Sequence, residues 1–238
     1  MRRFILAFTV LWLAGLHLHA AGIAETRAFT AAKNAFRAGI WDRAEKELGA
    51  FAEKYPKSTN VAQAFLLQAE ARMKLGRLGD AADLLNDHLD KAGERADEYL
   101  YWLAQAKFQD AKFSEAANIF GRLAREFPKS AYRLEAALGE AASLAKSKPE
   151  QWPRVIELLG DAKGAFQSAA GLDPTNEMVY RGGLLLAEAQ FALKNYQAAE
   201  AALTTLTNQQ PGVELNWQRQ FLLSRVQLAD ERAEEALQ

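Results

Sequence analysis

The sequence contains no cysteine, and this absence excludes disulfide bonds, thiolate metal sites and cysteine nucleophiles. Histidine is also scarce: His17 and His19 lie in the apolar N-terminal segment, which leaves His88 as the one imidazole of the remaining chain. Neither GxGxxG nor GxxxxGK[ST] occurs, so the glycines form no phosphate-binding motif. The sequence therefore predicts no metal, no cofactor and no enzymatic activity.

An excess of positive charge is also lacking. Lys and Arg number 29 against 30 Asp and Glu, giving a net charge of −1, and both signs alternate along the sequence. Without a basic stripe to neutralise phosphates, we expect no nucleic-acid binding. No segment shows sustained alternation of apolar and polar residues, which excludes an obvious β-sheet. Half of the residues are apolar, as is typical of a folded protein.

The N-terminus has the pattern of an export signal. Arg2 and Arg3 precede an uncharged apolar run, residues 4–16, and small residues follow at 20–24. This run of roughly 13 residues is too short to span a bilayer but suits a signal peptide. We predict a signal peptide over residues 1–24, cleaved before Glu25 or after Ala20, and a periplasmic or secreted protein without a stable membrane anchor. The alternative is an uncleaved anchor or a buried helix.

The most informative pattern is a repeat. Residues 41–58 and 113–130 resemble each other at an offset of 72, and a related copy lies between them at 78–85. A period of about 35, built from two apolar-striped segments, indicates stacked helical hairpins. Small residues recur where two helices of a hairpin would approach closely, at Ala44, Ala81, Ala116 and Ala199.

Position by position, these segments resemble the tetratricopeptide repeat, with a small residue at position 8, a bulky one at 17, Ala at 20, an apolar one at 24 and Pro at 32. The resemblance implies an all-α protein: an α-solenoid, coiled as a right-handed superhelix, of about six hairpins over residues 25–238. The repeats would start near residues 25, 62, 97, 132, 180 and 217. The fourth is enlarged, with a second helix expected to run from about Trp152 to Ala170, and the last is incomplete.

Two further motifs refine this interpretation. Asp42 followed by Glu45 has the spacing of a capping box, which predicts the start of a helix. The segment 101–104 followed by Phe113, together with the phrase Tyr/Phe-Pro-Lys-Ser at 55–58 and 127–130, resembles the tetratricopeptide domains of the Tol–Pal-associated periplasmic protein and of the lipoprotein that assembles outer-membrane barrels. This resemblance implies a protein–protein interaction in the cell envelope. The coiled coil of the first protein and the lipid-anchor cysteine of the second are missing, so it implies no particular complex.

Tetratricopeptide proteins bind ligands in a groove lined by the first helix of each repeat. Carried onto this sequence, the lining residues include Lys33, Arg37, Glu70, Lys74, Tyr101, Gln105, Gln109, Arg133, Glu140, Arg181, Glu188 and Arg225, with Leu66 and Leu184 beside them. The resemblance implies a protein or peptide ligand in the envelope and no particular oligomeric state. For each residue the alternative is an ordinary solvated surface. The alternative for the whole chain is the helical N-terminal region of a larger envelope enzyme, such as a cell-wall lytic transglycosylase, with its catalytic domain after residue 238.

Overall fold

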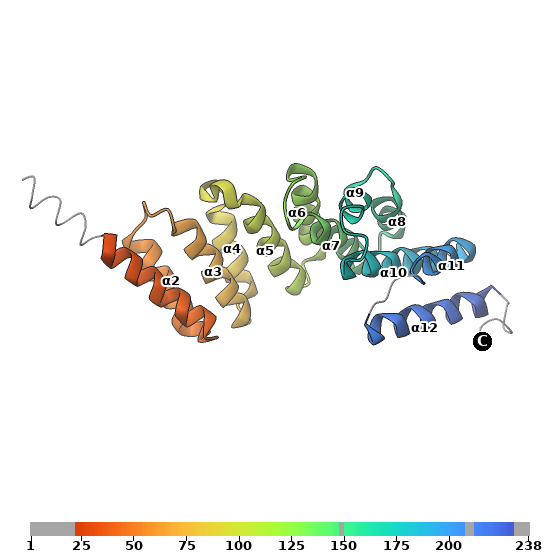
Figure 1. Ribbon diagram of the computed structural model, residues 1–238, viewed down its shortest axis with the longest axis horizontal. Coiled ribbons are helices and arrows are strands. Elements are labelled where there is room, and N and C mark those ends of the chain that lie inside the picture. Colours follow the sequence, from red (N-terminus) through yellow and green to blue (C-terminus); the bar gives the residue numbers. More distant parts are fainter. Residues whose placement is uncertain (1–21, 148–149, 208–211, 231–238) are drawn as a thin grey trace, which may run out of the picture. The chain divides into compact units, whose positions relative to one another are not determined.

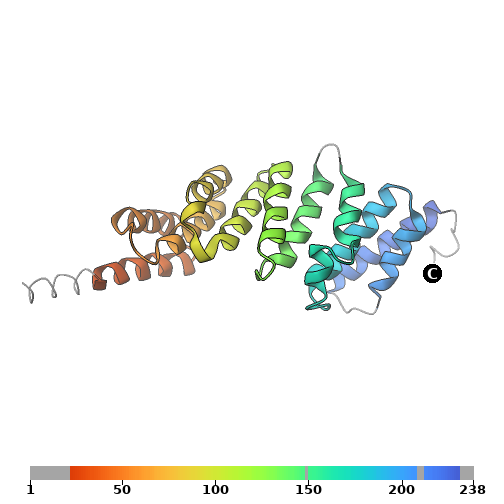
Figure 2. The same ribbon diagram turned by 90° about the horizontal axis from the view of Figure 1, so that it is seen from above.

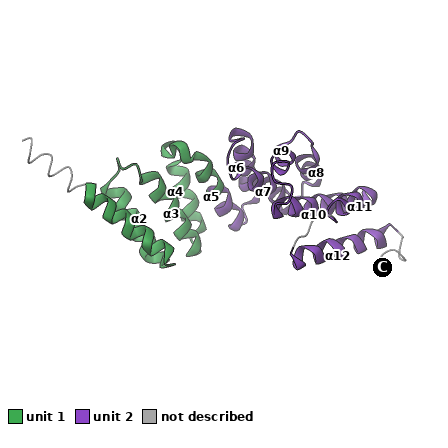
Figure 3. Ribbon diagram, viewed as in Figure 1, with its two compact units in different colours: residues 1–102 green, residues 103–238 purple. Residues whose placement is uncertain are grey.

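The computed structural model describes residues 22–147, 150–207 and 212–230 (Figure 1). Every regular element in these ranges is a helix, and none of the described residues belongs to a strand. The chain divides into two compact units, residues 1–102 and 103–238, and the boundary falls inside helix α5 (Figure 3). The predicted all-α fold is thereby confirmed for the described residues.

Unit 1 consists of helices joined by short turns. Its elements are a helix over residues 22–37, α2 (Trp41–Lys54), α3 (Val61–Lys74), α4 (Leu78–Asp87), two 3-10 turns (Leu89–Lys91 and Gly93–Arg95) and the first part of α5 (Ala96–Gln109). Helix α3 packs against both α2 and α4. Pro56 follows the C-cap residue Tyr55, where a missing N–H cannot break the helix. Consecutive helices are therefore neighbours in space, as in a stack of hairpins.

Unit 2 begins with the last part of α5 and also consists of helices joined by turns. Its elements are α6 (Phe113–Glu126), α7 (Arg133–Lys146), α8 (Trp152–Gly160), α9 (Ala165–Ala170), α10 (Glu177–Ala192), α11 (Tyr196–Thr205) and α12 (Val213–Ala229). Helices α6 and α7 lie side by side, and α10 packs against α8 and α11 (Figure 2). Helix α12 adds to the α10–α11 hairpin through Leu222 and Val226.

The helix boundaries reproduce the repeat. Helices α2 and α6 both have 14 residues and start 72 residues apart, and α3 and α7 show the same relation. In four hairpins an alanine of the first helix is followed, 12 residues later, by an alanine of the second. All eight are fully buried: Ala32 and Ala44, Ala69 and Ala81, Ala104 and Ala116, Ala187 and Ala199. Larger side chains at these points would separate the two helices.

Aromatic side chains pack across the turn of three hairpins. The pairs are Phe36 with Trp41, Phe108 with Phe113 and Phe191 with Tyr196, with ring centres 5.3, 5.4 and 6.0 Å apart. In each pair the first ring comes from the end of the first helix and the second from the start of the next. These distances are typical of stabilising aromatic contacts, so the rings fix the hairpin turn.

The fourth repeat departs from the expected single second helix. It contains two helices, α8 and α9, with a break after Gly160. The Asp161 side chain accepts a hydrogen bond from the Lys163 N–H (3.0 Å), and the Gly164 N–H donates to the Asp161 carbonyl (2.8 Å). Local turns of this kind compete with helix propagation. The prediction of one helix to Ala170 was therefore wrong.

The capping-box prediction was also wrong. The N-cap residue of α2 is Ile40, and no side chain caps it. Glu45 instead accepts hydrogen bonds from Arg72 Nε (2.9 Å) and Gln68 Nε2 (3.3 Å) of α3. Burial opposes the ionisation of Glu45, but these bonds and the arginine charge together lower its pKa. Glu45 thus joins α2 to the next hairpin rather than starting its own helix.

Several predictions lie outside the described residues. They concern residues 1–21 of the predicted signal peptide, the expected proline at position 32 of the fifth repeat, Pro211, and the end of the incomplete last repeat, residues 231–238. Within the described ranges, no helix has both the length and the apolar character needed to cross a membrane. The signal peptide and its cleavage site stay predictions.

The turn between two helices of a hairpin contains a residue with positive φ. Gly39 and Gly76 have φ of 71° and 76°, and Ala111 and Lys194 occupy the equivalent turns with 57° and 62°. The following N–H donates to a carbonyl five residues earlier, as Lys112 does to Lys107 (2.9 Å). This is the Schellman arrangement, in which glycine fits without steric cost. Ala111 and Lys194 therefore hold an unfavourable backbone conformation.

We predict that Ala111→Gly stabilises the protein by about 0.5–1 kcal/mol, because the relief of the left-handed strain exceeds the added freedom of the unfolded chain. The reverse substitution in the matching turn, Gly39→Ala, should destabilise by a similar amount. Urea unfolding of both variants measures the two effects. A loss of stability in Ala111→Gly would contradict this assignment of the turn.

Candidate functional site

In unit 1, five predicted groove residues lie on the first helices of their hairpins. Arg37 and Lys74 are exposed, whereas Lys33, Glu70 and Tyr101 are half-buried. The Lys33 ammonium lies 5.2 Å from the centre of the Phe29 ring. The Tyr101 ring packs edge-on against Trp102, with centres 5.3 Å apart. Leu66 is buried and contributes to packing.

Glu70 is the most perturbed of these groups. Burial and the neighbouring negative charge of Glu98 raise the pKa of Glu70 to about 7, while the positive charge of Lys74 acts in the opposite direction. Glu98 itself pairs with Arg95 (Nη1 to Oε2, 2.8 Å). A positively charged group placed beside Glu70 would relieve its repulsion from Glu98. Glu70 and Lys74 also show that the first helix of the second repeat places opposite charges on one face.

In unit 2, most of the predicted residues are engaged within their own region. Arg181 pairs with Glu177 on α10 (Nη2 to Oε1, 2.6 Å), and Arg133 Nε donates to the Ala124 carbonyl (3.3 Å). Gln109 and Glu188 are exposed, and Gln105 is half-buried. Leu184 packs on the apolar clusters around Ala187 and Tyr180 and is only partly buried.

Glu140 does not belong to an accessible groove, which corrects its assignment. It is only 9% exposed, and its carboxylate accepts a hydrogen bond from Arg125 Nη1 of α6 (3.2 Å). Burial raises the pKa of Glu140, although the charges of Arg125 and Arg154 act in the opposite direction. A side chain at Gly121 would approach the Glu140 carboxyl to 2.6 Å, so the glycine of α6 makes room for the carboxyl group.

The error at Glu140 has a structural cause. Gln68 and Gly49 form the same contact two repeats earlier, because a side chain at Gly49 would lie 2.8 Å from Gln68 Nε2. Gly49 precedes Gly121 by 72 positions, and Gln68 precedes Glu140 by the same number. The starts of α3 and α7 are also 72 residues apart. The fourth repeat therefore starts two residues later than near 132. In this register Glu140, like Gln68, falls at a buried contact between hairpins.

Helix α12 exposes apolar side chains that the sequence analysis did not assign to the site. Trp217, Phe221 and Leu228 are 59, 52 and 56% exposed. When the sixth repeat starts at 217, Phe221 and Leu228 occupy groove positions 5 and 12. Their positions in the repeat were therefore the signal that could have identified them as groove residues. The predicted groove residue Arg225 lies among them, with its guanidinium carbon 4.9 Å from the Phe191 ring centre and 5.8 Å from that of Phe221.

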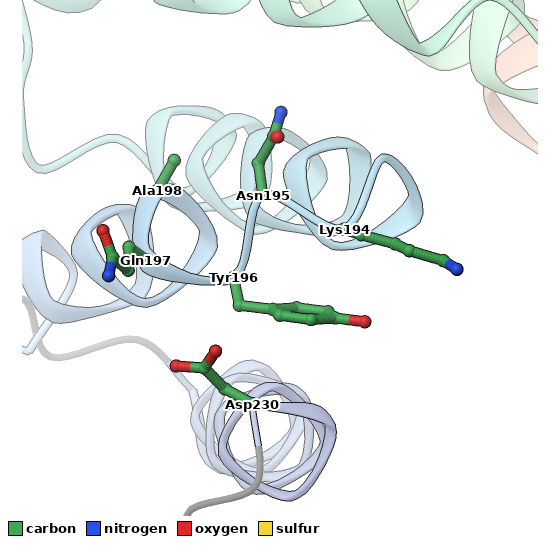
Figure 4. Close-up of a pocket in the computed structure, with 6 residues that line it drawn as sticks. All are labelled: Lys194, Asn195, Tyr196, Gln197, Ala198 and Asp230. Carbon is green, nitrogen blue, oxygen red and sulfur yellow. The ribbon is translucent and has the colours of Figure 1, made fainter.

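A pocket of about 440 Å³ lies near the end of α12 (Figure 4). Its lining comes from the turn before α11, the start of α11 and the last described residue: Lys194, Asn195, Tyr196, Gln197, Ala198 and Asp230. The Tyr196 ring extends past Asp230 on the side away from Ala198 (Figure 4). None of the predicted groove residues lines this pocket, so it is a separate feature.

The described part of the chain contains no group of three or more His, Asp or Glu side chains that could hold a metal ion. His88 packs its ring against Phe65, with centres 3.8 Å apart, and its Nδ1 lies 3.0 Å from the Leu84 carbonyl. Its environment is therefore that of a packing residue.

The family model described as tetratricopeptide repeat matches residues 28–58 and 98–130. These segments coincide with the hairpins of the helix at 22–37 with α2 and of α5 with α6. The chain contains tetratricopeptide repeats. No curated protein matches it.

Solved structures share the fold of these tetratricopeptide hairpins at low sequence identity. A tetratricopeptide repeat protein from Parabacteroides merdae ATCC 43184 is similar over 90% of this chain and 76% of its own, with a TM-score of 0.66 and 13% identity. BtubC (BKLC) from P. vanneervenii is similar over 87% of both chains, with a TM-score of 0.63 and 16% identity. A putative kinesin light chain from Podosopora anserina with nearly identical repeats covers 85% of this chain and 96% of its own (TM-score 0.56, 16% identity). These likenesses confirm the predicted fold of tetratricopeptide-like hairpins.

We predict that Glu70 makes stability fall as pH rises. Its pKa is about 7 in the folded chain and 4.5 as a free group, so between these values the folded state binds more protons and unfolding becomes easier as pH increases. Glu70→Gln should match the wild type near pH 5 and exceed its stability at pH 8 by about 1 kcal/mol, after allowance for solvent screening.

Urea unfolding at both pH values measures this difference, and Glu53→Gln on the exposed surface of α2 is the matched control. The stability difference between Glu53→Gln and the wild type should be the same at both pH values. A pH-independent difference for Glu70→Gln as well would show that Glu70 is fully solvated.

Proposed function

We propose that this chain is exported and acts in the cell envelope as a scaffold that binds a protein or peptide. The observation that carries the scaffold role is the succession of tetratricopeptide hairpins, because this repeat is a protein–protein interaction module with an extended binding surface. The binding residues would lie on first helices, where Arg37, Lys74 and Gln109 are exposed and do not form the apolar core.

The N-terminal sequence supports export. Arg2 and Arg3, the apolar run 4–16 and the small residues before Glu25 have the order of a signal peptide. The absence of cysteine is compatible with an oxidising compartment, where stray thiols form unwanted disulfides. The resemblance of segments 55–58 and 127–130 to periplasmic tetratricopeptide domains favours the same compartment.

We predict that the full chain, produced in a bacterial host, is recovered outside the cytoplasm with an intact mass that begins at Glu25 or a few residues earlier. Leu11→Arg with Leu13→Arg should retain the protein in the cytoplasm, because charges interrupt the apolar run. Wild-type protein in the cytoplasm with Met1 retained would contradict export.

Photo-crosslinking tests the binding role separately. A crosslinking amino acid at Arg37, Lys74 or Gln109 should yield protein adducts in the envelope. The controls are exposed residues on second helices, Lys46, Asp83 and Asn118, which should yield none. Adducts from the second helices alone would place the partner on the opposite surface and contradict the proposed groove.

A further inference from the structure

Helix α12 has two apolar faces, and only one of them is covered in the described chain. Leu215, Leu222 and Val226 are buried against α10 and α11. Trp217, Phe221 and Leu228, which we call the α12 stripe, are each more than half exposed. Several large apolar side chains exposed on one face of a helix are typical of an interaction site.

The α12 stripe is ordered by contacts between its own side chains. The Trp217 and Phe221 rings are stacked nearly parallel, with an angle of 3° and centres 5.3 Å apart. Arg225 lies along the edge of the stripe, because its guanidinium contacts both Phe191 of α10 and Phe221. Side chains held in this way lose little conformational freedom when a partner binds.

Arg225 also defines the charge that a partner must carry. A guanidinium above aromatic rings keeps its five N–H donors directed outwards in its own plane. Among the described residues no carboxylate forms an ion pair with Arg225, whereas Arg181 on α10 is paired with Glu177. An acidic side chain next to an apolar surface would therefore complement this part of α12.

The spacing of the α12 stripe favours a helical partner. Trp217, Phe221 and Leu228 lie on one face of the helix over 11 residues, or about 16 Å at 1.5 Å per residue. Side chains on such a face can pack between the side-chain rows of a second helix, as in helix–helix packing generally. The apolar face of an amphipathic helix presents anchors at matching intervals.

We propose that the α12 stripe binds an amphipathic helix of a partner protein, with the apolar face of that helix on Trp217, Phe221 and Leu228 and an acidic residue paired with Arg225. This inference rests on the proposed scaffold function and specifies the chemistry of its partner.

The test uses the full mature chain labelled with 5-fluorotryptophan. Its tryptophans, Trp41, Trp102, Trp152 and Trp217, give separate fluorine signals, and Trp217→Phe assigns the last one. The probes are two synthetic helical peptides of roughly 18 residues with the same leucine face. One carries glutamate beside this face and the other carries lysine.

We expect the glutamate peptide to shift the Trp217 signal and the lysine peptide to bind at least about tenfold more weakly. Arg225→Glu should invert this preference, and Phe221→Ala should weaken both peptides. The matched control is Arg122→Glu on α6, an exposed arginine paired with Glu126, which should change either affinity by less than about twofold.

Three results would overturn the proposal. They are a Trp217 signal that neither peptide moves, equal affinities of the wild type and Arg225→Glu for both peptides, and a Trp217 signal without a solvent isotope shift in the free chain. The last would show that the chain itself, or a second copy, covers the stripe. Export and the crosslinks from Arg37, Lys74 and Gln109 do not depend on α12, so the proposed function would survive each of these failures.

Discussion

A pair of buried alanines, one from each helix of a hairpin, is the feature on which four hairpins of this structure depend. Four such pairs are fully buried, among them Ala104 with Ala116 and Ala187 with Ala199. Because an alanine carries only a methyl group, the two helices can lie close together at this pair, and the pair limits how one helix packs on the other. A fixed hairpin also determines which side chains point into the core and which stay accessible to a partner. The surface chemistry of the scaffold therefore follows from the smallest side chains of its core.

The turns within hairpins and the contacts between hairpins accompany the buried alanine pairs. Aromatic pairs such as Phe108 with Phe113 pack over the turn, and a residue with positive φ reverses the chain, even where it is Ala111 rather than glycine. Between hairpins, Gly49 and Gly121 make room for a polar side chain of the next helix. A glycine is needed there because the neighbour is Gln68 or Glu140, whose polar group needs space and a partner.

The sequence was sufficient to predict the hairpin fold, its period and the buried alanines, because each of these is repeated and each copy supports the others. The exceptions are single events. Glu140 was assigned to the groove because the start of the fourth repeat was expected two residues too early, and the turn around Asp161 depends on one side-chain hydrogen bond. Apolar periodicity alone did not separate the exposed surface of α12 from core packing, because both faces of that helix carry large apolar residues; only the repeat positions of Phe221 and Leu228 pointed to the groove. Burial decided which face was which.

Buried alanine pairs set the geometry of the four hairpins that contain them, and replacing alanine by leucine tests this claim most directly. Ala44→Leu and Ala199→Leu enlarge a buried contact, whereas Ala50→Leu and Ala201→Leu make the same change on the exposed side of the same helices, α2 and α11. We predict that the buried replacements lower the free energy of unfolding by about 1–3 kcal/mol and speed hydrogen exchange in their own hairpin, while the exposed ones change it by less than about 0.5 kcal/mol. Equal effects on the buried and exposed sides, measured by urea unfolding and hydrogen exchange, would contradict the claim.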